Sequence, residues 1–200
     1  MGLDYSQAVD LAFNRTRRYE NVLIVQGSIL CPPLARNSLG CIYSLGVIHH
    51  LESLQEGLRE LGKLLKENGK MHVWTYSREG NELYLAVVKP LRWLAKRISY
   101  GSLWSLSRLL ATLSWPYLFV CFYVKNKLLK TLLPMREYLS FIHELGFEVY
   151  VLVIHDQLAP SIVFYPSRKD VLNWVKRAVL LIFHMDMRTN NSWRIGLRRC

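Results

Sequence analysis

The sequence contains glycine but no glycine-rich loop. None of its 11 glycines lies within two residues of another. A loop of the G-x-G kind is therefore absent, although such loops let backbone amides approach a phosphate or another anionic group closely. No such loop is hidden elsewhere in these 200 residues.

Cysteine is scarce and scattered. The four cysteines, Cys31, Cys41, Cys121 and Cys200, form no C-x-x-C pair and have no histidine at ligand spacing. This pattern argues against a zinc site and against a disulfide framework, so we expect no metal cofactor and a reducing compartment. The first residues, MGLDYSQAVD, lack the basic and apolar regions of a signal peptide. We therefore expect a cytoplasmic location.

Acidic residues are few. The chain has 15 Asp+Glu against 26 Lys+Arg, a formal net charge of +11. The basic residues form small groups, for example Lys89, Arg92, Lys96 and Arg97, or Lys125, Lys127 and Lys130. Such charge suits a solvated basic surface, and it also favours an anionic membrane. We do not expect a nucleic-acid partner, because no RNA-binding motif accompanies the charge.

One apolar segment is almost long enough to span a membrane. Residues 103–124 contain Arg108 as their only charge. Serines, Thr112 and Pro116 interrupt the segment, so we expect a buried or membrane-facing pair of cap helices rather than a span. Pro90 and Pro116 are expected to break helices.

A strand, a helix and a strand follow one another over residues 41–76. The apolar strand 41–45 leads into Gly46 and two histidines, a helix is expected over 53–65, and a Lys-Glu-Asn-Gly turn precedes strand 71–76. The helix has leucines at helical spacing. This order predicts a βαβ unit of a parallel sheet.

The remaining pattern predicts an α/β chain with three regions. Residues 1–80 hold the partial core, with a strand end at 1–4, a helix at 6–18 and a strand at 22–25. Residues 81–147 form a helical cap insertion. Residues 148–200 complete the sheet, with strands at 148–154, 179–187 and 193–198 and a helix at 168–177.

Four motifs, taken in order, resemble class I S-adenosylmethionine-dependent methyltransferases of the small-molecule type. They are GLDYSQAV at residues 2–9, VQGSIL at 25–30, SLGVIHH at 44–50 and NNSWR at 190–194. The resemblance implies a Rossmann-like sheet with strand order 3-2-1-4-5-7-6 and a helical cap insertion. Strand 1 and its Gly-rich loop have no counterpart here, so strands 2 and 4 are expected to keep unpaired edges.

The same resemblance implies a cofactor site. Asp4, followed by Tyr5, takes the place of the acid that holds the ribose hydroxyls, although Asp4 can also be read as an ordinary strand-end or N-cap residue. Ser28 and Ile29 stand where the family contacts adenine, with Ser28 replacing an acid. The backbone at the methionine part of the cofactor corresponds to Ser44, Leu45 and Gly46.

His49 is the candidate catalytic residue. At the mouth of the substrate pocket it could act as a general base or orient a nucleophile. In many members of the family the same histidine only caps the next helix or packs beside the cofactor. No metal ligand is expected.

Two functions follow from the sequence. The first is S-adenosylmethionine-dependent methylation of an unidentified small molecule, impaired or absent in this truncated form because S-adenosylmethionine binds weakly without the Gly-rich loop. The alternative is a non-catalytic binding or scaffolding module. That module would use the basic, aromatic cap for peripheral contact with a membrane surface or a partner protein.

Overall fold

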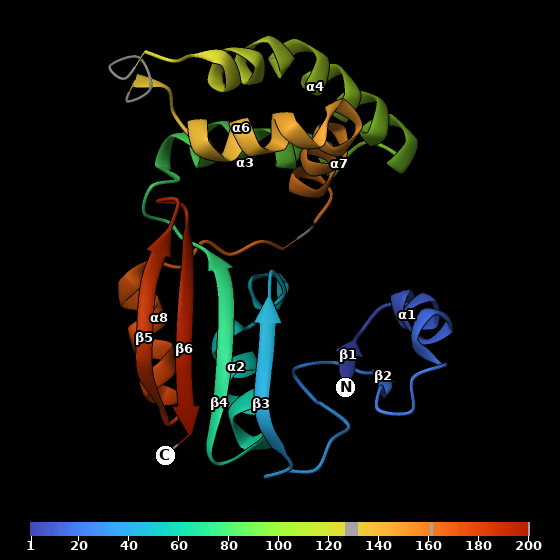
Figure 1. The fold of residues 1–200 in the computed structure, drawn as a ribbon, viewed down its shortest axis with the longest axis vertical. Coiled ribbons are helices and arrows are strands. Elements are labelled where there is room, and N and C mark those ends of the chain that lie inside the picture. Colours follow the sequence, from blue (N-terminus) through green and yellow to red (C-terminus); the bar gives the residue numbers. More distant parts are fainter. Residues whose placement is uncertain (127–131, 161, 200) are drawn as a thin grey trace. The chain divides into compact units, whose positions relative to one another are not determined.

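The computed structural model describes residues 1–126, 132–160 and 162–199, so Lys127, Lys130 and Cys200 lie outside it. The chain forms two compact units. Unit 1 comprises Met1–Arg78, Ile162–Arg188 and Ser192–Cys200, and unit 2 comprises Glu79–Ser161 and Thr189–Asn191. Figure 1 shows the strands in unit 1 and a group of helices in unit 2.

Unit 1 begins with a two-stranded parallel sheet. Strand β1 (Gly2–Asp4) pairs with β2 (Ile24–Gln26), and helix α1 (Ala8–Thr16) connects them. The expected strand, helix and strand are therefore present, with bounds shifted by a few residues. A parallel pair requires such a crossover, because the second strand must start at the same end as the first.

A four-stranded sheet forms the rest of unit 1. Its order is β3-β4-β6-β5, built from β3 (Leu39–Leu45), β4 (Leu65–Tyr76), β5 (Leu180–Arg188) and β6 (Ser192–Arg199). β3 and β4 are parallel, whereas β6 runs antiparallel between β4 and β5. The 3-10 turn η1 (Ile48–His50) and helix α2 (Leu54–Leu64) connect β3 to β4, which confirms the predicted βαβ unit.

The Lys-Glu-Asn-Gly segment is not a separate turn. It lies inside β4, where Asn68 has a positive φ of 60° and the register against β3 shifts between Leu39 and Cys41. The bulge absorbs the irregular residues without ending the strand. β4 is consequently longer than the sequence predicted.

The two sheets have the order expected of a class I sheet without its first strand. In chain order, β1 and β2 correspond to strands 2 and 3, and β3, β4, β5 and β6 to strands 4, 5, 6 and 7. The family order 3-2-1-4-5-7-6 places strand 1 between β1 and β3. Among the residues that the structure describes, β1 pairs only with β2, and β3 only with β4. The predicted fold class is thus confirmed, including the two unpaired edges.

One face of the larger sheet is covered by α2 and by α8 (Arg168–Arg177). Both helices begin at well-formed N-caps: Ser53 accepts from the backbone of Glu56, and Ser167 forms a capping box with Asp170. The buried core between helices and sheet includes Ile48, Leu58, Leu65, Met71, Val171, Val175, Ile195 and Leu197.

Unit 2 consists of helices α3 (Glu82–Ala95), α4 (Tyr100–Tyr123), α6 (Arg136–Leu145) and α7 (Phe147–Leu158). The prediction that Pro90 and Pro116 break helices is wrong, since each lies inside a helix. A proline removes one backbone hydrogen bond. On both sides of Pro116, the fully buried Ala111 and Leu118 pack into the core of unit 2 and hold α4 together.

The expected strand over residues 148–154 is also wrong, because this segment belongs to α7. β-Branched residues favour a strand only weakly, and packing of an apolar helix face against other helices can outweigh that preference. Tyr150, Val151, His155 and Leu158 are buried along the helix, and Tyr150 and Val151 join the core formed with α4. The helices of unit 2 therefore continue to Leu158, beyond the predicted end of the cap at residue 147.

Among the described residues, one helix, α4, is long and apolar enough to cross a membrane. The mean hydropathy of an 18-residue stretch of this helix is 1.2, and 22% of that stretch is buried. α4 is a single helix, not the predicted pair. Length and composition alone do not distinguish a span from a partly buried cap helix.

Candidate active site

The candidate site residues lie at the carboxyl ends of the parallel strands. Asp4 ends β1, where its backbone carbonyl accepts from Gly27 at 2.9 Å. Its Oδ1 accepts from both the backbone nitrogen and the hydroxyl of Ser6, each at 2.7 Å. Asp4 therefore stabilises the turn into α1. Both bonds use Oδ1, so they do not occupy Oδ2, and the two interpretations of Asp4 are compatible.

The residues beside Asp4 differ in their surroundings. The side chain of Tyr5 is 79% exposed. Ser28 follows β2, and its hydroxyl accepts from the backbone of Leu30 at 3.1 Å, which forms a local turn. Ile29 packs against the core beside α2. Ser28 and Ile29 thus belong to the same turn after β2, and the side chain of Ile29 packs against the core.

The second group lies at the end of β3. Ser44 is buried, and its Oγ has no hydrogen-bond partner among the described residues. Leu45 is exposed on the opposite side of the strand. Gly46 has φ +76° and donates its backbone N–H to the carbonyl of Trp74 at 3.2 Å. The left-handed conformation favours glycine, and it lets the chain turn sharply away from the sheet.

His49 is buried, with 1% of its surface exposed. Its ring lies 4.3 Å from His50, 4.6 Å from Tyr76 and 6.1 Å from Trp74, measured between centroids. The backbone carbonyl of His49 accepts from Phe164 at 2.8 Å, and the ring of His50 bonds the carbonyl of Ile162 at 2.9 Å. These contacts fix the loop after β3. His50 is held in a structural role.

Three aromatic residues around His49 were not predicted as site residues. Trp74 and Tyr76 lie on alternate positions at the end of β4, with ring centroids 5.3 Å apart. Tyr165 stacks on Tyr76 at 5.1 Å with an angle of 15° between the rings. The alternation of Trp74 and Tyr76 was a readable signal for one side of a strand. The contribution of Tyr165 was not readable, because it comes from a distant loop.

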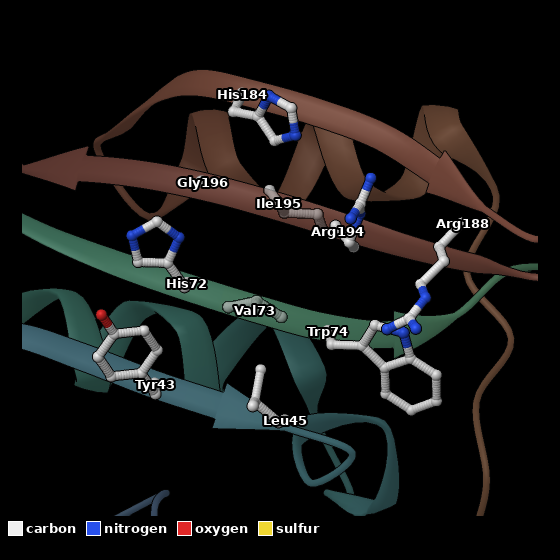
Figure 2. Close-up of a pocket in the computed structure, with 10 residues that line it drawn as sticks. All are labelled: Tyr43, Leu45, His72, Val73, Trp74, His184, Arg188, Arg194, Ile195 and Gly196. Carbon is white, nitrogen blue, oxygen red and sulfur yellow. The ribbon is translucent and has the colours of Figure 1, made fainter.

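A hollow of ≈ 690 Å³ lies on the sheet face opposite α2 and α8 (Figure 2). We call this side of the sheet the open face. Leu45 and Trp74 belong to both the hollow and the strand end, so the hollow adjoins the site. Across the open face, Tyr43 stacks on His72 at 5.3 Å, and His72 meets Phe183 edge-on at 5.6 Å.

The open face is positively charged. Its acid Asp186 bonds Arg194 and also His184, the latter at 2.9 Å. The hydrogen bond from Arg194 is the main reason why the pKa of the Asp186 carboxyl is lowered. The pKa of Tyr43 is raised, chiefly by its interaction with the Cys41 side chain. Arg188 also lines the hollow.

The site offers polar and aromatic contacts rather than metal ligands. The described residues contain no group of three or more His, Cys, Asp or Glu side chains that could hold a metal ion. The strand ends provide one carboxylate, Asp4, one orphan hydroxyl, Ser44, and one buried imidazole, His49. Such an arrangement can bind hydroxyl groups and position an aromatic or cationic ligand.

Comparison with known proteins finds a family that resembles the first part of the chain. Residues 1–73 match the family described as a methyltransferase domain. This segment includes Asp4, Ser28, Ser44, Gly46 and His49. No curated protein sequence matches the chain.

Solved structures resemble the chain over nearly its whole length. A S-adenosylmethionine-dependent methyltransferase from Aquifex aeolicus has a TM-score of 0.51 at 11% identity, with 99% of this chain and 67% of that chain covered. A protein from Bacillus halodurans that is described as a methyltransferase has a TM-score of 0.55 at 9% identity, with 98% of this chain and 81% of that chain covered. The PKMT2 protein of Rickettsia typhi, in complex with AdoHcy, has a TM-score of 0.63 at 16% identity, with coverages of 98% and 43%. Residues 1–73 are therefore similar to a methyltransferase domain, and the chain has the fold of the class I S-adenosylmethionine-dependent methyltransferases.

Proposed function

We propose that this chain is built for methyl transfer from S-adenosylmethionine to a small-molecule acceptor, and that cofactor binding is weak unless a further strand joins its two sheets. The observation that carries the proposal is the strand order. β2-β1 and β3-β4-β6-β5 reproduce the class I sheet on either side of one absent strand. We expect the reaction in the cytoplasm, which agrees with the free thiols of Cys31, Cys41 and Cys121.

The residues fit the cofactor at three places. Asp4 would accept a ribose hydroxyl through Oδ2, since its known bonds use Oδ1. Gly46 gives the backbone a close approach at the end of β3. Ser44 Oγ, buried without a partner among the described residues, would gain one from a bound polar group.

The fit fails at the carboxypropyl end of the cofactor. The chain has no Gly-rich loop whose amides would bind a carboxylate. Ser28 replaces an acid, and its hydroxyl already accepts from Leu30. Weak binding thus follows from lost donors and one lost charge, while the remaining strand ends keep their geometry.

The bound cofactor would supply an electrophilic methyl group on a sulfonium, transferred in line to a nucleophile. The contribution of this chain is positioning. The rings of His49, Tyr76 and Tyr165 form a compact wall at the ends of β3 and β4. This wall would orient an acceptor and exclude water. Within this wall, His49 would be the group that accepts a proton from the acceptor.

Titration calorimetry with S-adenosylhomocysteine tests the proposal. The chain alone should bind at least about a thousandfold more weakly than a complete methyltransferase, because it lacks several hydrogen bonds to charged groups. A fusion that adds a strand and Gly-rich loop before Met1 should restore binding. Micromolar binding by the chain alone would overturn the claim of weak affinity.

A matched pair of substitutions tests the site within the fusion protein. Asp4→Ala should abolish the restored binding, whereas Asp10→Ala on α1, also exposed, should leave it unchanged. Because Asp4 also stabilises the turn into α1, circular dichroism must show that both variants keep their helix content. Normal binding by the Asp4→Ala fusion would show that β1 is not the ribose-binding strand.

A further inference from the structure

The outward side of α4 is apolar where solvent-facing helix surfaces are usually polar. Its inward side is buried, with Leu103, Ser107, Ala111, Leu118 and Cys121 packed in unit 2. On the other side Leu109, Leu113, Pro116, Val120 and Tyr123 follow one another at spacings of four and three residues. All are exposed, for example Leu113 by 70% and Leu109 by 55%. We call these five residues the α4 stripe.

A helix that is apolar on both sides needs two apolar environments. The core formed with α6 and α7 provides one of them. The described residues of unit 2 do not cover the α4 stripe, whose five members are exposed. α4 contains no acidic residue, and its single charge, Arg108, is bonded to both carboxylate oxygens of Glu148 on α7 at 3.0 and 2.8 Å.

Aromatic side chains gather at the carboxyl end of the stripe. Phe119 and Tyr123 have ring centroids 4.3 Å apart, and Phe122 stacks on His143 of α6 at 4.6 Å. Phe119 and Tyr123 are each more than half exposed. Amphipathic aromatic rings of this kind are enriched at the boundary between lipid and water.

Cationic residues flank α4 at both ends. Lys96 and Arg97 precede it, and the guanidinium of Arg97 lies 3.4 Å from the ring centroid of the exposed Trp93. Lys125 follows α4 and is exposed. Cations at the borders of an apolar and aromatic surface complement anionic lipid headgroups.

We propose that the α4 stripe docks on an anionic membrane surface, with α4 lying in the interface. Lying flat, α4 keeps its inward side packed against α6 and α7 while the stripe enters the lipid. A spanning orientation would strip α6 and α7 from α4 and place the Arg108–Glu148 pair in hydrocarbon. Docking depends only on unit 2, so it holds whether or not the chain binds a cofactor.

Vesicle flotation with the full chain tests this proposal. The chain should float with vesicles of equal parts phosphatidylcholine and phosphatidylglycerol, and float less with phosphatidylcholine alone. Salt should weaken the association through screening. Absence from the anionic vesicles at low salt would overturn the proposal. Resistance to alkaline carbonate extraction would also overturn it, because an interfacial helix is released by that treatment.

Substitutions of two equally exposed leucines test whether the α4 stripe is the surface that contacts the membrane. Leu109 in the stripe and Leu11 on α1 are both 55% exposed. Leu109→Asp should lower vesicle binding by about tenfold or more, the scale of one exposed leucine transferred to lipid. Leu11→Asp should leave it unchanged. Equal effects of the two substitutions would show that the stripe is not the contact.

Charge variants and sedimentation separate the remaining outcomes. Lys96→Gln and Arg97→Gln should each lower binding to anionic vesicles by about fivefold, without changing the weaker binding to neutral ones. Analytical ultracentrifugation compares the parent chain with the Leu113→Asp variant. We expect no dimer of the parent chain that is lost in this variant. A dimer of that kind would assign the stripe to a second copy of the chain and overturn the membrane proposal.

Discussion

The two faces of the larger sheet differ sharply. The face under α2 and α8 holds the core, with side chains such as Met71 and Leu197 that have no exposed surface. The open face carries Tyr43, Leu45 and Phe183 at exposed fractions of 70, 64 and 50%. Sheets with parallel strands are normally covered on both faces. Within the described part of unit 1, helices α2 and α8 thus cover one face of the sheet, whereas the open face carries exposed apolar side chains.

The covered face contributes the apolar core of unit 1, whereas the open face contains the hollow. The covered face alone supplies a connected apolar core, so unit 1 can hold its β3-β4-β6-β5 sheet without strand 1. The open face instead carries the positively charged hollow beside the site. The residues that form the apolar core and those that line the hollow therefore lie mainly on opposite faces of this sheet.

Substitution of one leucine on each face tests how much the two faces contribute to stability. Leu58 on α2 is 1% exposed, and Leu181 on β5 is 48% exposed on the open face. Leu58→Ala should lower the free energy of unfolding by about 2–5 kcal/mol, because it leaves a cavity in the core. Leu181→Ala should cost about 0.5 kcal/mol or less. Urea unfolding measures both, and similar losses would mean that the open face is covered in solution.

Substitution of Gly196, on the open face, should lower the free energy of unfolding by a smaller amount than substitution of Leu58. A Cβ at this position on β6 would stand 2.7 Å from the ring of Phe183. Because Phe183 is half exposed and can rotate away, Gly196→Ala should cost only about 1 kcal/mol, at the low end for overpacking. The double variant Gly196→Ala with Phe183→Ala should remove that cost. A cost that persists in the double variant would place the strain in the backbone rather than in the ring.

The covered face was predictable from the sequence. The leucines of α2, the Gly-and-His loop after β3 and the strand at the end of the chain all lie where their patterns indicated. Local patterns of this kind work because each element buries one face against a single core. The sequence also located Ser44 in β3, with Gly46 directly after it and His49 in the following turn, whereas the roles of these residues in binding and catalysis stay predictions.

The errors came from segments whose surroundings decide their structure. The β-branched run in α7 became helical because it packs on α4, and Pro116 stayed within α4 for the same reason. Tyr165 reaches the ring of Tyr76 from a loop that is distant in the sequence. None of these contacts follows from local spacing, since each depends on a tertiary partner.

The N-cap of α8 should give the smallest of these effects on stability. It belongs to the covered face, because α8 is one of the two helices that pack on the core. Asp170 Oδ2 accepts from the hydroxyl and the backbone nitrogen of Ser167, at 2.6 and 2.9 Å. These hydrogen bonds lower the pKa of the Asp170 carboxyl, the bond from the hydroxyl most. Asp170→Asn should therefore cost about 1 kcal/mol or less at pH 7, the usual scale of a helix cap.

The pH dependence of that cost follows from the direction of the shift. The folded-state pKa lies below the unfolded value of about 3.9. The stabilisation by the carboxylate is therefore complete above that value and is lost as the pH falls through the folded-state pKa. Urea unfolding of the two proteins should converge as the pH is lowered below about 4. Asp10→Asn, which removes a first-turn charge from α1 without a capping box, should cost less at pH 7. A difference between Asp170→Asn and the parent chain that stays constant with pH would show that the capping box acts through geometry rather than charge.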